Sequence, residues 1–183
     1  MTDTSSRGDE LRATIDRLVR PIEDWPEPGI TFRDITPLLG DARALADVVD
    51  GLTELALLAG PVDAVLGIEA RGFLFGPSIA LRLGVGLVPV RKVGKLPAVS
   101  LSTAYDLEYG SAVLEMHADA LQPGARVLVV DDVLATGGTM RAAADLVRQA
   151  QGTVAGNLVM IELLALGGQA SLAPTGCASL RSY

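Results

Sequence analysis

The sequence predicts an α/β fold in which a central, mainly parallel sheet is flanked by helices. Short continuous apolar runs, typical of strands buried on both faces, alternate with helical segments that end at glycine. The 183 residues are 49% hydrophobic and include one cysteine, so the chain can bury a sizeable core without disulfides. We therefore expect a single domain over residues 1–183.

The N-terminal part of the chain has a less regular pattern. Residues 1–10 are polar and lack apolar periodicity, so we expect them to be disordered, and a short amphipathic helix follows over residues 11–19. Residues 25–37 are too rich in proline and glycine for a helix and predict an extended loop, either a linker or a binding segment. Asp41 then caps a one-faced helix that stops at Gly60.

Two strand–helix–strand units follow and predict a doubly wound sheet. The predicted strands are residues 64–68, 85–90, 126–130 and 153–164, and the predicted helices are residues 73–83 and 139–150. Between the units, residues 92–110 have no clean period. A loop of this length in a compact domain is typical of a flexible lid.

Composition excludes several classes of function. A net charge of -7 with 4% aromatic residues lacks the positive field and the stacking surfaces that nucleic-acid binders use. The most apolar stretch, residues 154–166, is shorter than a bilayer span and contains Asn157 and Glu162, so we expect no membrane segment. The single cysteine and a polar start without a charged-then-apolar leader favour a cytoplasmic location.

The residues that carry chemistry concentrate after the strand at 126–130. Asp131 and Asp132 follow it directly. A turn of small and hydroxyl residues then leads into a helix: Ala135, Thr136, Gly137, Gly138 and Thr139. Small residues admit a ligand close to the backbone and a helix N-terminus offers free N–H groups, so this turn predicts a phosphate cradle. The two carboxylates would repel phosphate and are expected to accept hydrogen bonds from sugar hydroxyls or to face a hydrated cation, which indicates a sugar phosphate.

Other readings of this turn and of the rest of the chain fit less well. An ordinary strand–turn–helix with a capping threonine explains the glycines but not two adjacent acids. The chain has no G-x-x-x-x-G-K-[ST] motif, and Gly84-Val85-Gly86 is followed by Pro89 instead of a third glycine. His117, the only histidine, has no recognisable nucleophile partner, so a catalytic triad is unsupported.

Residues 129–139, VVDDVLATGGT, resemble the phosphoribosyl pyrophosphate signature of the type I phosphoribosyltransferases. Further segments make the chain similar to the adenine phosphoribosyltransferases: residues 28–35, 69–77, 90–97 and 105–110. The resemblance implies the type I fold, with a lid and a small hood that binds the base. It also implies a homodimeric purine salvage enzyme that transfers a 5-phosphoribosyl group to N9 of adenine, giving AMP and pyrophosphate, with Mg²⁺ entering bound to the donor.

The resemblance assigns roles to residues outside the cradle. A loop with a cis peptide at Glu69–Ala70 would hold pyrophosphate, and four basic residues would meet it, some of them across a dimer interface: Arg71, Arg91, Lys92 and Lys95. Thr31, Phe32 and Arg33 would receive adenine, with Leu163 covering its other face. Glu108 is the implied acid/base residue. From the residues alone, the charged positions can also be solvated surface charges, Phe32 a hydrophobic anchor and Leu163 part of the core.

Two alternatives stay open at this point. A hypoxanthine or xanthine phosphoribosyltransferase would differ only in a few contacts to the edge of the base. A regulator that binds phosphoribosyl pyrophosphate without catalysis would usually add a nucleic-acid-binding domain or a basic surface, and an implied Glu108 in the lid favours catalysis instead.

Overall fold

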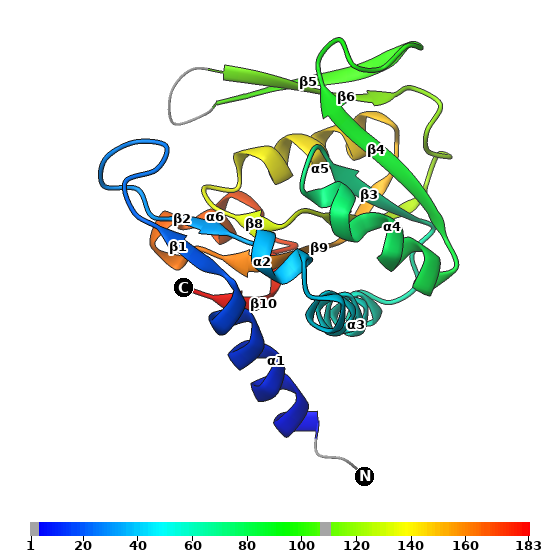
Figure 1. Cartoon of the computed structure of the whole chain (residues 1–183). Helices are drawn as coiled ribbons and strands as arrows, with labels where there is room; N and C mark the ends of the chain where they lie inside the picture. Colours follow the sequence, from blue (N-terminus) through cyan, green and yellow to red (C-terminus); the bar gives the residue numbers. More distant parts are fainter. Residues whose placement is uncertain (1–3, 107–110) are drawn as a thin grey trace. The chain divides into compact units, whose positions relative to one another are not determined.

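The computed structural model describes residues 4–106 and 111–183 (Figure 1). Two compact units, residues 1–51 and 52–183, make up the chain. Among the described residues, no helix has both the length and the apolar composition that crossing a membrane requires.

The first unit combines short helices with a two-stranded ribbon. Its elements are α1 (Thr4–Leu18), β1 (Arg20–Ile22), β2 (Phe32–Asp34), α2 (Thr36–Leu39) and the start of α3 (Ala42–Leu58). Within the segment expected to be disordered, residues 1–10, the structure has a helix from Thr4 onward. On this helix Arg12 pairs with Asp9, three residues earlier, at 2.6 Å.

Residues 25–37 are only partly the extended loop that we expected, because β2 and α2 lie within them. β2 pairs antiparallel with β1, and Arg20 donates to Asp34 Oδ2 at 2.6 Å across the ribbon. Asp41 caps α3 as predicted, since its Oδ1 accepts the backbone N–H groups of Arg43 and Ala44, both at 3.0 Å.

The second unit is an eight-stranded sheet with helices. Its elements are β3 (Ala64–Ile68), α4 (Gly72–Leu83), β4 (Gly86–Lys92), β5 (Ser100–Asp106), β6 (Ser111–His117), β7 (Arg126–Val130), β8 (Val133–Leu134), α5 (Gly138–Gln149), β9 (Thr153–Glu162), η1 (Leu164–Leu166), α6 (Gly168–Ser171) and β10 (Ala178–Ser182). The strand order is β10-β9-β7-β3-β4-β6-β5, and β8 pairs with β9. The predicted mainly parallel sheet is confirmed, because β10, β9, β7, β3 and β4 are parallel neighbours.

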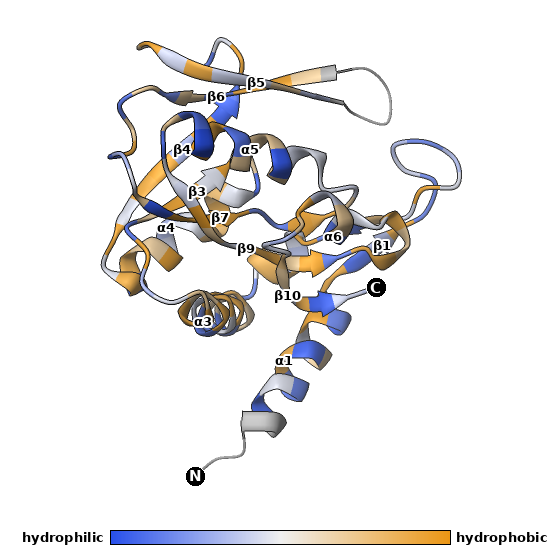
Figure 2. Ribbon diagram, turned by 180° about the vertical axis from the view of Figure 1, so that it is seen from behind, coloured by the Kyte–Doolittle hydropathy of each residue, from blue (hydrophilic) through white to orange (hydrophobic). Residues whose placement is uncertain are grey.

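Local sequence signals account for most element boundaries in this unit. The two strands predicted at 64–68 and 126–130 have the predicted bounds, and all five residues of β3 are buried. α4 ends at Gly84, which adopts the left-handed φ of 70° that favours glycine. Figure 2 shows hydrophobic residues concentrated along the central strands.

The segment predicted as a loop at 92–110 instead contains β5, which forms an antiparallel hairpin with β6. Leu114 and Met116, two residues apart on β6, are buried on the same face, and Tyr105 of β5 is buried in the same core. The hairpin packs on α5, where Gln149 Nε2 donates to Thr103 Oγ1 at 2.6 Å. The apolar alternation of β5 is short and interrupted by serine and threonine, so the sequence pattern alone does not distinguish this strand from a loop.

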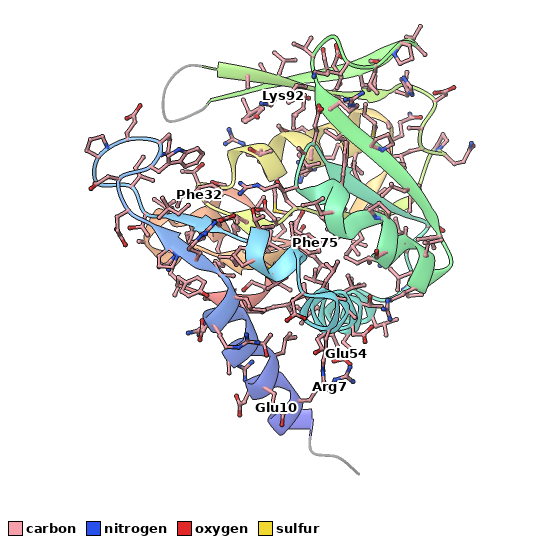
Figure 3. The ribbon with its side chains drawn as sticks, in the orientation of Figure 1. Arg7, Glu10, Phe32, Glu54, Phe75 and Lys92 are labelled. Atoms are coloured by element: carbon pink, nitrogen blue, oxygen red, sulfur yellow. The ribbon has the colours of Figure 1, made fainter. Side chains whose placement is uncertain are left out.

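Helices cover both faces of the sheet. Phe75 of α4, labelled in Figure 3, is fully buried, and a Cβ on Gly76 would lie 3.5 Å from Gly67 Cα of β3. Leu66 and Ile68 point to the opposite face, where they join a core with the buried residues of α5.

The connections through these helices diverge between β3 and β7. The chain runs from β3 through α4 to β4 on one side, and from β7 through α5 to β9 on the other. In open α/β sheets, ligands bind at such a switch point, beyond the carboxyl ends of the strands. The loops after β3 and β7 are therefore where a site is expected.

Candidate active site

The loops after β3 and β7 meet at the switch point through an ion pair and a close backbone contact. Arg71 Nε lies 2.9 Å from Asp132 Oδ2. A Cβ on Gly72 would lie 2.5 Å from the carbonyl oxygen of Val130, so only glycine lets the two loops approach this closely. The expected cis peptide at Glu69–Ala70 is confirmed in the same loop.

The two predicted carboxylates lie at the end of β7 in different surroundings. Asp132 is buried, with a relative exposure of 2%, whereas Asp131 is half-buried and its Oδ1 accepts the Asp132 backbone N–H at 2.9 Å. Burial raises the pKa of Asp131 well above its ordinary value, and the adjacent Asp132 charge raises it further. Burial also raises the pKa of Asp132, although the Arg71 charge opposes the shift. Both groups would gain from hydroxyl donors or positive charge on a ligand.

The turn from Ala135 to Thr139 leads into α5, as the cradle prediction required. Gly137 is the N-cap residue of α5, and no side chain caps the helix. The first backbone N–H groups of α5 are thus left without a side-chain acceptor, which is the arrangement that binds phosphate at a helix N-terminus.

The structure adds a packing reason for glycine at position 137. Its φ is +84°, and a Cβ there would lie 2.7 Å from the carbonyl oxygen of Gly168 and 2.9 Å from Ser171 Cβ. Ser171 Oγ also donates to the Thr136 carbonyl at 2.8 Å. Packing of the turn against α6 therefore requires glycine at position 137, in addition to the expected role of this residue beside a phosphate.

The basic residues at the end of β4, Arg91 and Lys92, are held by a carboxylate that sequence reasoning did not single out. Arg91 Nη2 donates to Glu69 Oε1, and the Lys92 backbone N–H donates to Glu69 Oε2, both at 3.0 Å. Arg91 Nη1 donates to the Lys95 carbonyl at 3.0 Å. These hydrogen bonds, that from Arg91 most of all, lower the pKa of Glu69. Its place directly after a buried strand, like that of Asp131, is the signal that could have identified it.

The residues expected to receive adenine are divided between the two units. In the first unit, Thr31 Oγ1 donates to Glu23 Oε2 at 2.7 Å. The ring of Phe32, labelled in Figure 3, meets the Trp25 ring edge-on with centroids 4.4 Å apart. Sequence reasoning missed Trp25 as a partner of Phe32.

Arg33 lies beside Phe32 on β2 of the first unit. In the second unit, Leu163 directly follows β9, is half-buried and donates its N–H to the Leu134 carbonyl at 2.9 Å. Glu108 lies outside the described residues.

A metal site built from protein side chains alone is absent from the described part of the chain, where no three His, Cys, Asp or Glu side chains come together. Burial disfavours the negative charge of Asp131 and Asp132, and Arg71 offsets this effect only in part. The two carboxylates therefore suit a cation that arrives with a ligand.

Comparison with known proteins decides the family. Residues 39–166 match the phosphoribosyl transferase domain family. Over 164 residues, the chain is 57% identical to the adenine phosphoribosyltransferase of Thermobifida fusca, covering 90% of this chain and 93% of that protein. This chain belongs to the adenine phosphoribosyltransferase family. The relative from Streptomyces coelicolor is 56% identical and covers 85% of each chain.

Solved structures of adenine phosphoribosyltransferases agree with this assignment and confirm the predicted fold class. The enzyme of Thermoanaerobacter pseudethanolicus has a TM-score of 0.90 and 47% identity, covering 93% of this chain and 99% of that one. The enzyme of Saccharomyces cerevisiae, solved with an imino-altritol bisphosphate and adenine, has a TM-score of 0.87 and 35% identity, with coverage of 96% and 99%.

Proposed function

We propose that this chain transfers the 5-phosphoribosyl group of phosphoribosyl pyrophosphate to N9 of adenine in purine salvage, forming AMP and pyrophosphate. The observation that carries the proposal is the position of Arg71 beside Asp132 at the switch point of the sheet. One site there offers a cation to a departing pyrophosphate and carboxylates to a ribose. Membership of the adenine phosphoribosyltransferase family supports the choice of base.

The charges at the site suit the displacement. The bond from C1 of the ribose to pyrophosphate breaks while the bond to N9 forms, so the ribose becomes positive and the leaving group negative. Asp131 and Asp132 face the ribose, orient its hydroxyls and offset its developing charge. Arg71, Lys92 and Lys95 attract pyrophosphate, and Arg91 adds positive charge from a more buried position.

The cradle holds the 5-phosphate at the other end of the ribose. Backbone N–H groups at Gly138 and Thr139 begin an α5 helix that no side chain caps. The hydroxyls of Thr136 and Thr139 add donors, and the small residues Ala135 and Gly137 let the phosphate approach the backbone. Binding energy from this remote phosphate positions the anomeric carbon for reaction.

Adenine stacks on the ring of Phe32, and the neighbouring backbone groups at Thr31 and Arg33 read its edge. The edge-on Trp25 ring supports this role by restricting the ring of Phe32. Glu108 hydrogen-bonds the purine and accepts the N9 proton.

Further parts of the proposal concern the working form of the protein. Asp131 and Asp132 would face Mg²⁺ bound to the donor, and the ion would supply positive charge to the leaving group. The two units act as one phosphoribosyltransferase domain, in a homodimer located in the cytoplasm. Exposed leucines at the end of α3 and on α4, such as Leu58 and Leu81, offer apolar surface for a second copy to cover.

Pyrophosphate release tests the proposal. Purified protein with phosphoribosyl pyrophosphate and Mg²⁺ is supplied in turn with adenine, guanine, hypoxanthine and xanthine. We expect pyrophosphate release and AMP formation with adenine, and no pyrophosphate release with the other three bases. Faster turnover of hypoxanthine or xanthine would reassign the substrate, and donor binding without release for any base would indicate a regulator.

A further inference from the structure

Glu69 joins the carboxyl ends of β3 and β4. Its side chain is 15% exposed, and its two oxygens accept different donors, the Arg91 guanidinium and the Lys92 backbone N–H. The Glu69 backbone N–H donates to the Val90 carbonyl at 2.9 Å, which continues the pairing of the two strands by one residue. Glu69, the first residue of the expected pyrophosphate loop, thus holds Arg91 and Lys92 at the end of β4.

Arg91 extends this connection from Glu69 to the backbone of Lys95. Its Nη2 donates to Glu69 and its Nη1 to the Lys95 carbonyl, each at 3.0 Å. Its side chain is one-third exposed, and its Nε is buried with no hydrogen-bond partner among the residues that the structure describes. A guanidinium that uses both terminal nitrogens in this way spans two segments of backbone, because its donors lie in one rigid plane.

Lys92 and Lys95 differ from Arg91 in their exposure and in their pairing. Both are exposed, and within residues 4–106 and 111–183 neither ammonium group has an ion-pair partner. Their backbones, however, are bonded to the Glu69–Arg91 pair, Lys92 through its N–H and Lys95 through its carbonyl. The two cations free to meet an anion are therefore anchored at the backbone by the pair behind them.

We propose that Glu69 and Arg91 act as one positioning pair that holds Lys92 and Lys95 in place for pyrophosphate, an inference that rests on the proposed function. Arg91 then acts through the two lysines instead of contacting pyrophosphate itself. Glu69 contributes although its own charge repels the ligand, because a fixed backbone saves the ordering cost of binding with two long flexible side chains.

A double-mutant cycle tests the pair. Glu69→Gln and Arg91→Gln each break the connection, and each is expected to raise the KM for phosphoribosyl pyrophosphate about 10-fold, as for loss of one charge-assisted contact. The kcat and the KM for adenine should change less than about 3-fold, since the pair touches neither the ribose nor the base. The double variant should be no worse than either single variant, because both remove the same unit. Additive effects, or an effect of Arg91→Gln alone, would overturn the proposal.

Two further variants separate positioning from direct contact. Arg91→Lys keeps the charge but cannot span Glu69 and the Lys95 carbonyl, so it should behave like Arg91→Gln; full activity would show that Arg91 serves as a charge on the ligand. Asp145→Asn removes a carboxylate from another arginine pair, Arg148–Asp145 on α5 at 2.6 Å, and should leave the KM unchanged. If Glu69→Gln does not fold, Glu69→Asp provides the same comparison with a shortened reach.

Calorimetry with Mg²⁺ and pyrophosphate distinguishes this inference from the proposed function. The affinity for pyrophosphate should fall about 10-fold in both single variants and by no more in the double variant. Wild-type protein that binds pyrophosphate but does not consume adenine would contradict the proposed function and leave the pair supported. Wild-type protein that forms AMP, with unchanged pyrophosphate affinity in the variants, would contradict the pair alone.

Discussion

Arg71 Nε lies 2.9 Å from Asp132 Oδ2, and this contact joins the loop after β3 to the end of β7. Asp132 is almost fully buried, whereas the Arg71 side chain is 42% exposed. A buried carboxylate needs such a partner, because the charge loses its hydration on burial. In the proposed reaction the same two side chains serve different parts of the donor, Arg71 the pyrophosphate and Asp132 the ribose.

Asp131→Asn should stabilise the ligand-free protein and impair its activity. Burial and the Asp132 charge raise the pKa of Asp131, so its ionised form is disfavoured in the folded state. A carboxyl group with a raised pKa in the folded state lowers stability as pH rises through its unfolded pKa, and neutral asparagine removes that cost. We expect Tm to rise by a few degrees, as for about 1 kcal/mol in a domain of this size.

The same variant should lose at least about 10-fold in kcat/KM for phosphoribosyl pyrophosphate, since an amide bonds sugar hydroxyls more weakly than a carboxylate. Calorimetric melting at pH 7 and steady-state kinetics measure the two effects. A lower Tm together with full activity would contradict the role of Asp131 in binding.

Gly137→Ala should destabilise the fold through α6. Gly124 provides a matched control, because it has the same φ of +84° but nothing within 4 Å of a Cβ. Gly124→Ala should cost about 1 kcal/mol from the left-handed backbone alone. Gly137→Ala should cost about 1–3 kcal/mol more, because its Cβ would overlap the Gly168 carbonyl. Urea unfolding of both variants gives the difference, and equal costs would mean that α6 moves aside freely.

Glu108→Ala should lower kcat about 10²- to 10⁴-fold, the range for loss of a general acid or base. The KM for phosphoribosyl pyrophosphate should change little, because the proton in question belongs to the purine. Steady-state kinetics across pH 5–9 with adenine checks both expectations. Turnover close to that of the wild type would remove Glu108 from the mechanism.

Cys177, the only cysteine, should react slowly in the folded protein. Burial above all, with the nearby Glu162 and Asp131 charges, raises the pKa of its thiol to about 12. Compared with the ordinary value of 9.0, the thiolate fraction at pH 8 is smaller by roughly 1000-fold, and the thiolate is the reactive form. Iodoacetamide labelling followed by mass spectrometry should be slow in buffer and fast in urea. Comparable rates in both would contradict this protection.

Asp34 should make stability depend on pH in the acid range. The Thr36 hydroxyl above all, with the Thr36 backbone N–H and Arg20, holds the pKa of Asp34 at about 2 instead of 3.8. A lowered folded pKa stabilises the fold above pH 3.8, and this contribution is lost as pH falls toward 2. Asp34→Asn should therefore be less stable than the wild type at pH 6, and the difference should shrink toward pH 2. Urea unfolding over this range checks it, and a constant difference would exclude a charge effect.

Local patterns in the sequence were sufficient for much of the second unit. Continuous apolar runs identified β3 and β7, and Gly84 marked the end of α4. Each of these signals lies within a few neighbouring residues, where periodicity and turn chemistry operate. The hairpin of β5 and β6 was missed because its short alternating strands are weak signals until α5 covers one face.

The sequence by itself determined the family and the parallel sheet, and it predicted which residues bind a sugar phosphate. Only the tertiary structure decided which partners hold these residues. Arg71 pairs with Asp132, Glu69 with Arg91, and Gly137 packs against Gly168. These partners lie far apart in the chain, and a periodic pattern carries no information about them. They meet because the parallel strands end at one edge of the sheet and α6 closes behind the cradle.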